Sequence, residues 1–156
     1  MGTTKYFKDL AEISRKFTVI EHEFDAVIEK SLISFKEREN SPESTVPSDS
    51  DLKYTREVMD RFDKNIQTLK TLKTELNTLR TDAGNRGTFF KQGNIKQKLD
   101  QILTVDKIDN LKSEMKKCTN ALKKADARKD YAPLFEYLKE YERKAQVNEP
   151  KQRHQI

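Results

Sequence analysis

Hydrophobic residues recur along most of this chain in steps of three and four residues, the spacing that places them on one side of an α-helix. Over residues 6–36 the steps alternate strictly between three and four, as in a helix packed along its whole length. These positions are Leu10, Ile13, Phe17, Ile20, Phe24 and Val27. With Phe7 as a further aromatic, this is the most hydrophobic of the expected contact surfaces. The pattern predicts one long helix over residues 6–36.

A second long helix is predicted over residues 51–80. Its apolar steps mix threes and fours without strict alternation, which is the ordinary spacing of a helix in a globular protein. The apolar positions are Val58, Phe62, Ile66, Leu69, Leu72, Leu76 and Leu79. Ser50 or Asp51 is placed to cap the start of this helix. The segment 82–85 contains Gly84 and Asn85, which are stop signals for a helix.

The last part of the chain is predicted to form two or three further helices. A short one of about three turns is indicated by Ile95, Leu99, Ile102 and Leu103. Thr104 is expected to cap a longer one that carries Asp106 in its first turn. The apolar positions of the longer helix are Ile108, Leu111, Met115, Cys118, Leu122 and Ala125. A final helix is expected over residues 130–145, with Pro133 in its first turn.

The predicted fold class is all-α, an up-and-down bundle of four to five helices with left-handed packing. Residues 1–146 form the expected bundle domain, and residues 147–156 an expected disordered tail. Residues 37–50 contain two prolines and four serines and carry four acidic residues against one arginine. This composition predicts a mobile acidic loop between the first two long helices.

Composition agrees with a single helical domain. The chain has 156 residues, of which 37% are charged and 34% hydrophobic, with only four glycines and four prolines. Disorder is the competing interpretation of so polar a chain, but the periodic apolar positions argue against it. The single cysteine, Cys118, cannot form an internal disulfide, which suits a reducing compartment. Without an 18-residue apolar run or a signal-peptide core, the expected location is cytoplasmic, free or peripheral at a membrane.

No arrangement of residues indicates catalysis. His22 and His154 are far apart, and the segment GNRG at 84–87 lacks both the preceding strand and the GK[ST] ending of a phosphate-binding loop. No nucleophile with an activating base can be recognised in the sequence. We therefore expect a protein that is not an enzyme and that needs no cofactor and no metal.

The excess positive charge is concentrated in one region. Residues 86–124 contain ten basic and four acidic residues, a surplus that exceeds the net +5 of the whole chain. Lys112, Lys116 and Lys123 are spaced four and seven apart, so they are expected to share one helix face. Such a row attracts anionic surfaces, either phospholipid headgroups or an acidic protein, unless it is only a solvated face. The candidate anion-binding residues are Lys91, Lys96, Lys98, Lys112, Lys116 and Lys123.

Two adjacent phenylalanines, Phe89 and Phe90, follow a glycine-containing loop within this basic region. Two aromatic residues are few for stacking on bases, so nucleic acid is an unlikely partner. We expect at least one of the two to plug the end of the bundle beneath the loop. The alternative is that one is exposed and anchors a partner or a bilayer.

The stretch from Phe89 to Leu122 resembles the second half of HeLo-type four-helix bundles. These are the N-terminal bundles of mixed lineage kinase domain-like proteins and of fungal and plant cell-death signalling proteins. The resemblance is carried by FFK at 89–91, then IKQKLDQIL, then DKIDNLKSEMKKCTNAL, with MDRFDKNIQTLKTLKTELNTL in the place of the preceding helix. A competing likeness is to the three-helix N-terminal domain of syntaxins, although the break at Thr104 fits that domain poorly.

The first resemblance implies a non-catalytic interaction module in signalling or cell-death regulation. Bundles of that family associate with themselves and with phosphoinositide-rich membrane through basic residues, so protein partners, a homo-oligomer and an anionic membrane surface are the implied partners. The second likeness implies a cytoplasmic adaptor or scaffold, as in membrane trafficking, that binds a partner helix and not lipid.

Overall fold

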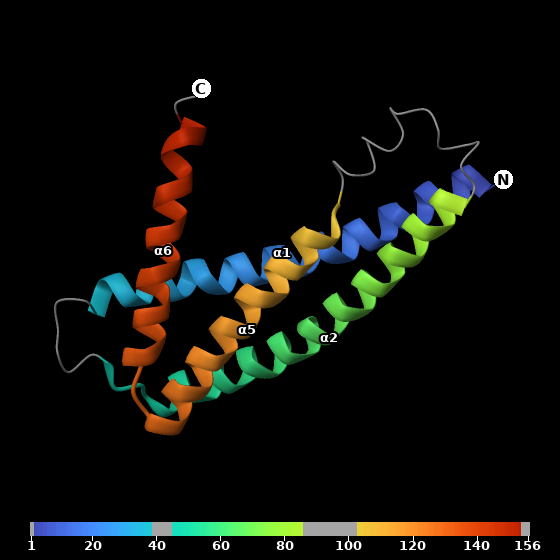
Figure 1. Cartoon of the computed structure of the whole chain (residues 1–156). Coiled ribbons are helices and arrows are strands. Elements are labelled where there is room, and N and C mark those ends of the chain that lie inside the picture. The colour runs from blue at the N-terminus through green and yellow to red at the C-terminus, as the bar shows by residue number, and fades with distance from the viewer. Residues whose placement is uncertain (1, 39–44, 86–102, 154–156) are drawn as a thin grey trace. The chain divides into compact units, whose positions relative to one another are not determined.

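The computed structural model describes residues 2–38, 45–85 and 103–153, and these ranges contain four helices and no strand. The helices are α1 (Gly2–Arg38), α2 (Asp49–Asn85), α5 (Val105–Arg128) and α6 (Ala132–Arg153), shown in Figure 1. The predicted all-α helical bundle is therefore confirmed. The short helix expected over residues 95–103 lies outside the described residues except for Leu103, which is not helical.

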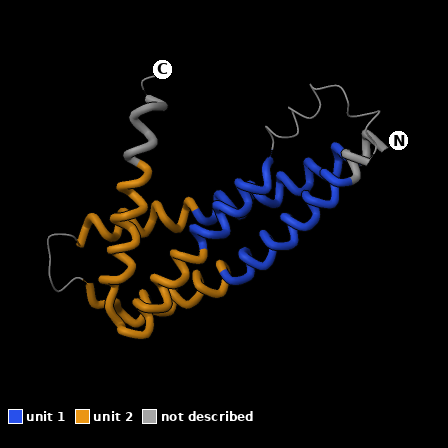
Figure 2. The backbone as a smooth tube through the Cα atoms, in the orientation of Figure 1, with its two compact units in different colours: residues 1–24, 63–115 blue, residues 25–62, 116–156 orange. Residues whose placement is uncertain are grey.

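The chain divides into two compact units, which Figure 2 shows in different colours. Unit 1 consists of Met1–Phe24 and Asp63–Met115, and unit 2 consists of Asp25–Phe62 and Lys116–Ile156. The helices α1, α2 and α5 each contribute one segment to each unit, whereas α6 belongs to unit 2 alone.

Unit 1 is held together by apolar side chains at the positions that the periodicity predicts. The buried residues are Leu10, Ile13, Phe17, Ile20, Phe24, Ile66, Leu69, Leu72, Leu76, Leu103, Ile108 and Met115. Lys73 Nζ of α2 lies 3.0 Å from Asp109 Oδ1 of α5, at the edge of this apolar interior. The predicted cap of α5 is confirmed, because Lys107 donates its backbone N–H to Thr104 Oγ1 over 3.2 Å.

The first turns of α1 differ from the sequence prediction. Phe7 was expected on the hydrophobic side, but it is 37% exposed, whereas Tyr6 is buried with 6% exposed. The reason is the period: Tyr6 precedes Leu10 by four residues and so continues the alternation of threes and fours. Phe7 precedes Leu10 by three, and Leu10 precedes Ile13 by three, so two successive steps of three break the alternation and place Phe7 off the buried side.

Unit 2 gains a fourth helical segment from α6, and aromatic contacts join α6 to α1. The rings of Phe35 and Phe135 have centroids 4.8 Å apart. Lys36 Nζ lies 3.1 Å from Glu142 Oε2 on the surface between the same two helices. The buried residues of unit 2 include Val27, Ile28, Phe35, Leu52, Val58, Phe62, Cys118, Leu122, Ala125, Tyr131, Leu134, Phe135 and Leu138.

The cap of α2 lies two residues earlier than the sequence predicts. Ser48, rather than Ser50 or Asp51, is the capping residue, since Asp51 donates its N–H to Ser48 Oγ over 3.1 Å. In return, Ser48 donates its N–H to Asp51 Oδ2 over 3.0 Å. This reciprocal pair is a capping box with aspartate as its acidic member, and it satisfies two N–H groups at the start of the helix.

The last helix begins as predicted but extends further. Asp130 Oδ1 accepts the backbone N–H of Ala132 over 3.0 Å, and Pro133 occupies the first turn. The helix ends at Arg153 and not at Ala145, so it includes residues that were expected to belong to a disordered tail. The apolar pattern, which ends near Tyr141, is informative about contacts and not about how far the backbone stays helical.

The turn from α5 to α6 holds Lys129 in a left-handed conformation, with φ of 52°. Lys129 N donates to Asp126 O over 3.3 Å and Asp130 N donates to Ala125 O over 3.1 Å, which is a Schellman motif. A residue with a Cβ is disfavoured there relative to glycine. We expect Lys129→Gly to raise the free energy of unfolding by about 0.5–1 kcal/mol, measured by urea denaturation.

The matched control for this prediction is Lys129→Ala, which removes the same charge but keeps a Cβ at the left-handed position. It should leave the stability within about 0.5 kcal/mol of the parent protein. If alanine stabilised the protein as much as glycine, the gain would come from the lost charge and not from the backbone conformation.

Candidate functional site

The segment of α5 in unit 2 has one apolar side and one basic side. Cys118, Ala121, Leu122 and Ala125 are buried in unit 2, and the thiol of Cys118 is 1% exposed, as expected for an apolar packing position. The exposed positions between 116 and 129 are Lys116, Lys117, Asn120, Lys123, Lys124, Ala127, Arg128 and Lys129. The basic members of that list (Lys116, Lys117, Lys123, Lys124, Arg128 and Lys129) form a surface that we call the basic face.

No acidic residue is exposed between positions 116 and 129, which makes the basic face uniform in sign. The carboxylate within this range, Asp126, points to α2, where its Oδ1 accepts the Nε–H of Arg56 over 3.0 Å. At about 100° per residue, the exposed positions on α5 occupy one arc of the helix. Their charges therefore add along one surface instead of cancelling around the helix.

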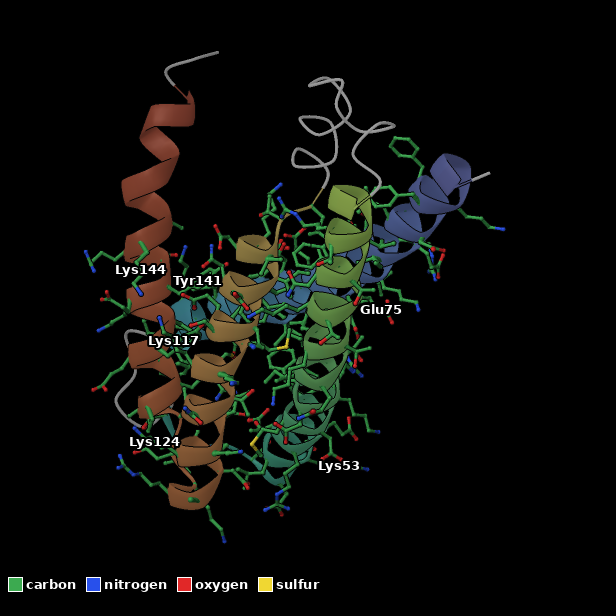
Figure 3. All side chains as sticks on the ribbon, turned by 45° about the vertical axis from the view of Figure 1, so that its right-hand side comes forward. Lys53, Glu75, Lys117, Lys124, Tyr141 and Lys144 are labelled. Atoms are coloured by element: carbon green, nitrogen blue, oxygen red, sulfur yellow. The ribbon has the colours of Figure 1, made fainter. Side chains whose placement is uncertain are left out.

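Figure 3 shows two members of the basic face, Lys117 and Lys124, on the same side of α5. They are seven residues apart, as are Lys116 and Lys123, so each pair repeats along the helix after two turns. The basic face thus consists of two adjacent rows rather than one.

The lysines that the sequence predicts as anion-binding residues do not all lie on the basic face. Lys116 and Lys123 are exposed members of the basic face. Lys112 belongs to unit 1, where its side chain is only 20% exposed and its Nζ lies 3.9 Å from Asp109 Oδ1. The same carboxylate pairs with Lys73. Lys112 is thus a half-buried member of an ion-pair group, and we do not include it in the basic face.

The other predicted site residues lie outside the described part of the chain. These are the candidate anion-binding residues Lys91, Lys96 and Lys98, and the pair Phe89 and Phe90. Whether the phenylalanines plug the bundle or serve as an anchor stays a prediction.

Sequence reasoning missed Arg128 and Lys129, which extend the basic face to the end of α5 and into the turn that follows it. The signal was present as a series of adjacent basic pairs, at 116–117, 123–124 and 128–129. The net charge of residues 125–156 is close to zero, so the net charge of that segment gives no sign of the basic pair at 128–129.

A second polar cluster of unit 2 lies around Tyr131. Burial raises the pKa of Tyr131, so its phenol stays protonated, and its hydroxyl lies 3.1 Å from Thr55 Oγ1. The backbone N–H of Tyr131 also donates to Thr45 O over 2.6 Å. These bonds tie the residue before α6 to α2 and to the segment before α2.

The part of the chain that the structure describes offers neither a metal site nor a membrane span. Among residues 2–38, 45–85 and 103–153, no group of three histidine, cysteine, aspartate or glutamate side chains is placed to hold a metal ion. None of the helices in these ranges has the length and apolar character needed to cross a bilayer.

Comparison with known proteins identifies no relative. No family model, no curated protein and no solved structure matches this chain.

Proposed function

We propose that this protein is a non-catalytic helical-bundle interaction module that binds an anionic phospholipid surface through the basic face of α5. The observation that carries the proposal is the uniform sign of the exposed residues between positions 116 and 129. Lysine and arginine side chains near an anionic bilayer each contribute roughly 1 kcal/mol to attraction. The attractions of several such residues on one arc of a helix add up to a binding free energy suited to reversible association with the membrane.

Phospholipid is favoured over nucleic acid by the composition of the same surface. Single-stranded nucleic acid is bound by aromatic side chains interleaved with basic ones. The non-basic exposed positions between 116 and 129 are Asn120 and Ala127, neither of which stacks on a base. A bilayer needs only the positive field, which this surface supplies.

Cosedimentation with liposomes tests the proposal. We expect the protein to sediment with phosphatidylcholine vesicles that contain phosphatidylserine, and not with phosphatidylcholine alone. Because exposed charges are screened by salt, retention should fall steeply between about 50 mM and about 300 mM NaCl. The double variant Lys116→Glu with Lys123→Glu should reduce retention at low salt at least about tenfold while keeping the helix content.

The matched control reverses the same charge elsewhere. Lys53 and Lys64 are exposed residues of α2, so Lys53→Glu with Lys64→Glu changes the net charge by the same amount without touching the basic face. This control should lose far less retention. Equal losses in the two double variants would show that net charge alone drives binding. Retention on duplex RNA but not on vesicles would assign the face to nucleic acid.

A second candidate function is an adaptor that binds a protein partner and ignores lipid. It is favoured by two large apolar side chains exposed in unit 2, Ile33 at 55% and Val46 at 66%. Failure to sediment with either vesicle would leave this candidate. A role in signalling or cell death, or self-association, rests on the resemblance of residues 89–122 to HeLo-type bundles and stays a prediction.

A further inference from the structure

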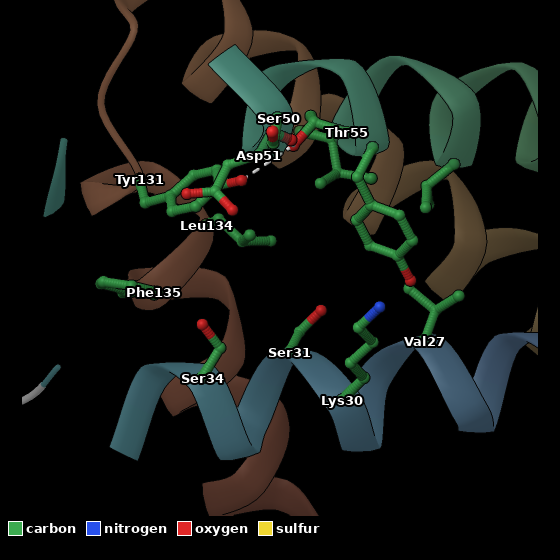
Figure 4. Close-up of a pocket in the computed structure, with 13 residues that line it drawn as sticks. Val27, Lys30, Ser31, Ser34, Ser50, Asp51, Thr55, Tyr131, Leu134 and Phe135 are labelled. Atoms are coloured by element: carbon green, nitrogen blue, oxygen red, sulfur yellow. Dashed lines mark hydrogen bonds between the residues drawn. The ribbon is translucent and has the colours of Figure 1, made fainter. Parts of the chain in front are cut away.

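Unit 2 contains a cavity of about 230 Å³ that is distinct from the basic face. Its apolar wall consists of Val27, Val58, Leu122, Leu134 and Phe135, all buried in the unit. One polar wall comes from α1, and Figure 4 shows the side chains of Lys30, Ser31 and Ser34 directed from that helix into the space. The cavity therefore combines an apolar wall with hydrogen-bond donors on α1 and with further polar side chains on α2 and before α6.

The donors on the α1 wall are not used by the described part of the protein. The hydroxyls of Ser31 and Ser34 make no hydrogen bond to any described residue, and Lys30 has no carboxylate partner there. The Lys30 ammonium instead lies 4.1 Å from the centroid of the Tyr54 ring, which lines the same cavity. An ammonium and two hydroxyls within one helical turn form a donor set that suits a carboxylate.

The opposite wall carries a carboxylate of its own, but that charge is already paired. Asp51 Oδ2 lies 3.3 Å from Arg38 Nη2 and accepts the backbone N–H of Ser48 over 3.0 Å. Tyr131 and Thr55 likewise bond to each other across 3.1 Å. The donors that bond to no described residue are thus the Lys30 ammonium and the hydroxyls of Ser31 and Ser34 on α1, together with the hydroxyls of Ser50 and Tyr54 on α2. Lys30 supplies the one positive charge among these donors.

The volume of the cavity limits the size of the ligand that it can hold. A dry cavity of about 150 Å³ is enough to hold benzene, so a cavity of about 230 Å³ holds a single ring with a short side chain. We propose that this cavity binds a small monocarboxylate, with the carboxylate at Lys30, Ser31 and Ser34 and an apolar ring or branched chain against Val58, Leu122 and Leu134. This site goes beyond the proposed membrane function and does not depend on it.

Titration with 3-phenylpropanoate, followed by 1H–15N NMR on the full chain, tests the site. We expect saturable shifts of the backbone amides of Ser31, Ser34, Thr55 and Leu134, with a dissociation constant of about a millimolar for a ligand of this size. The matched neutral compound, 3-phenylpropanamide, should bind about tenfold more weakly because it lacks the charge that Lys30 recognises.

Two variants separate recognition from general charge effects. Lys30→Met keeps the hydrocarbon stem and removes the ammonium, and it should abolish the preference for the acid over the amide. Lys53→Met, at an exposed lysine that does not line the cavity, should bind 3-phenylpropanoate like the parent protein. Both changes are at exposed positions, so the folded spectrum should be retained.

Three results would overturn the proposal. One is shifts at the cavity amides that do not saturate. Another is an unchanged acid preference in Lys30→Met, which would remove the lysine from recognition. The third is a set of shifts confined to residues 116–129, which would mean that the acid binds only to the basic face.

Discussion

Replacing Phe62 by alanine is expected to lower the free energy of unfolding by about 3–5 kcal/mol. Phe62 is fully buried in unit 2, with 0% of its surface exposed. It is larger than any other fully buried side chain described in that unit. Its removal loses the transfer free energy of a ring and leaves a space that the surrounding helices only partly fill. Urea denaturation followed by circular dichroism at 222 nm measures the change. A small protein loses a large fraction of its stability in this way.

Phe7→Ala is the matched control, because it removes the same ring from a position that is 37% exposed. The ring of Phe7 lies edge-on to that of Tyr6, with centroids 6.0 Å apart, so some contact is lost. The loss should stay below about 1.5 kcal/mol, the upper worth of one aromatic pair. Equal losses in the two variants would mean that the burial assigned to α1 or to α2 is wrong.

Asp51→Ala is expected to lower the free energy of unfolding by about 1–2 kcal/mol. The carboxylate accepts the N–H of Ser48 over 3.0 Å and lies 3.3 Å from Arg38 Nη2. Alanine leaves the amide of Ser48 without that acceptor and breaks the ion pair between the end of α1 and the start of α2. Asp49, an exposed carboxylate in the same first turn, offers the control Asp49→Ala, with an expected loss below about 0.5 kcal/mol.

The effect of Asp51 should depend on pH. Partial burial alone would raise the pKa of Asp51, but the amide and hydroxyl of Ser48 and the guanidinium of Arg38 outweigh it and hold that pKa below its ordinary value. A lowered pKa in the folded state stabilises the protein above the pKa of the unfolded chain and loses that contribution as the pH falls through the folded value. The difference between the parent protein and Asp51→Ala should therefore shrink below about pH 4. A difference that stayed constant down to pH 2 would contradict this assignment.

Most of the fold could be predicted from the spacing of apolar residues. The alternating steps from Leu10 to Val27 correspond to buried positions on α1, and the series from Ile108 to Ala125 is buried apart from Leu111. Most of the stability of such helices comes from burying one apolar side. The spacing of the apolar residues therefore shows the helical period in the sequence. The capping box was misplaced because Ser48, Ser50 and Asp51 are all good capping residues. Only the conformation of the chain entering α2 chooses among them.

The candidate site was less predictable. The sequence correctly indicated exposed positions for Lys116 and Lys123, since both lie opposite the apolar side of α5. It could not reveal that Lys112 is half-buried beside Asp109, because that depends on Lys73 of α2 packing against the same carboxylate. The cavity was also invisible from the sequence, since its walls come from all four helices.

The contacts of Tyr131 have a consequence for the order in which the chain folds. Its hydroxyl meets Thr55 across 76 positions of sequence, so that contact must close a long stretch of chain. Closing a loop costs entropy that grows with its length, and such contacts are expected to form after the local helical turns. The stability contributed by Thr55 and Tyr131 should then appear in slower unfolding, with little influence on the speed of refolding. The hydroxyl pair of Thr55 and Tyr131 would thus contribute mainly to how long the native state lasts.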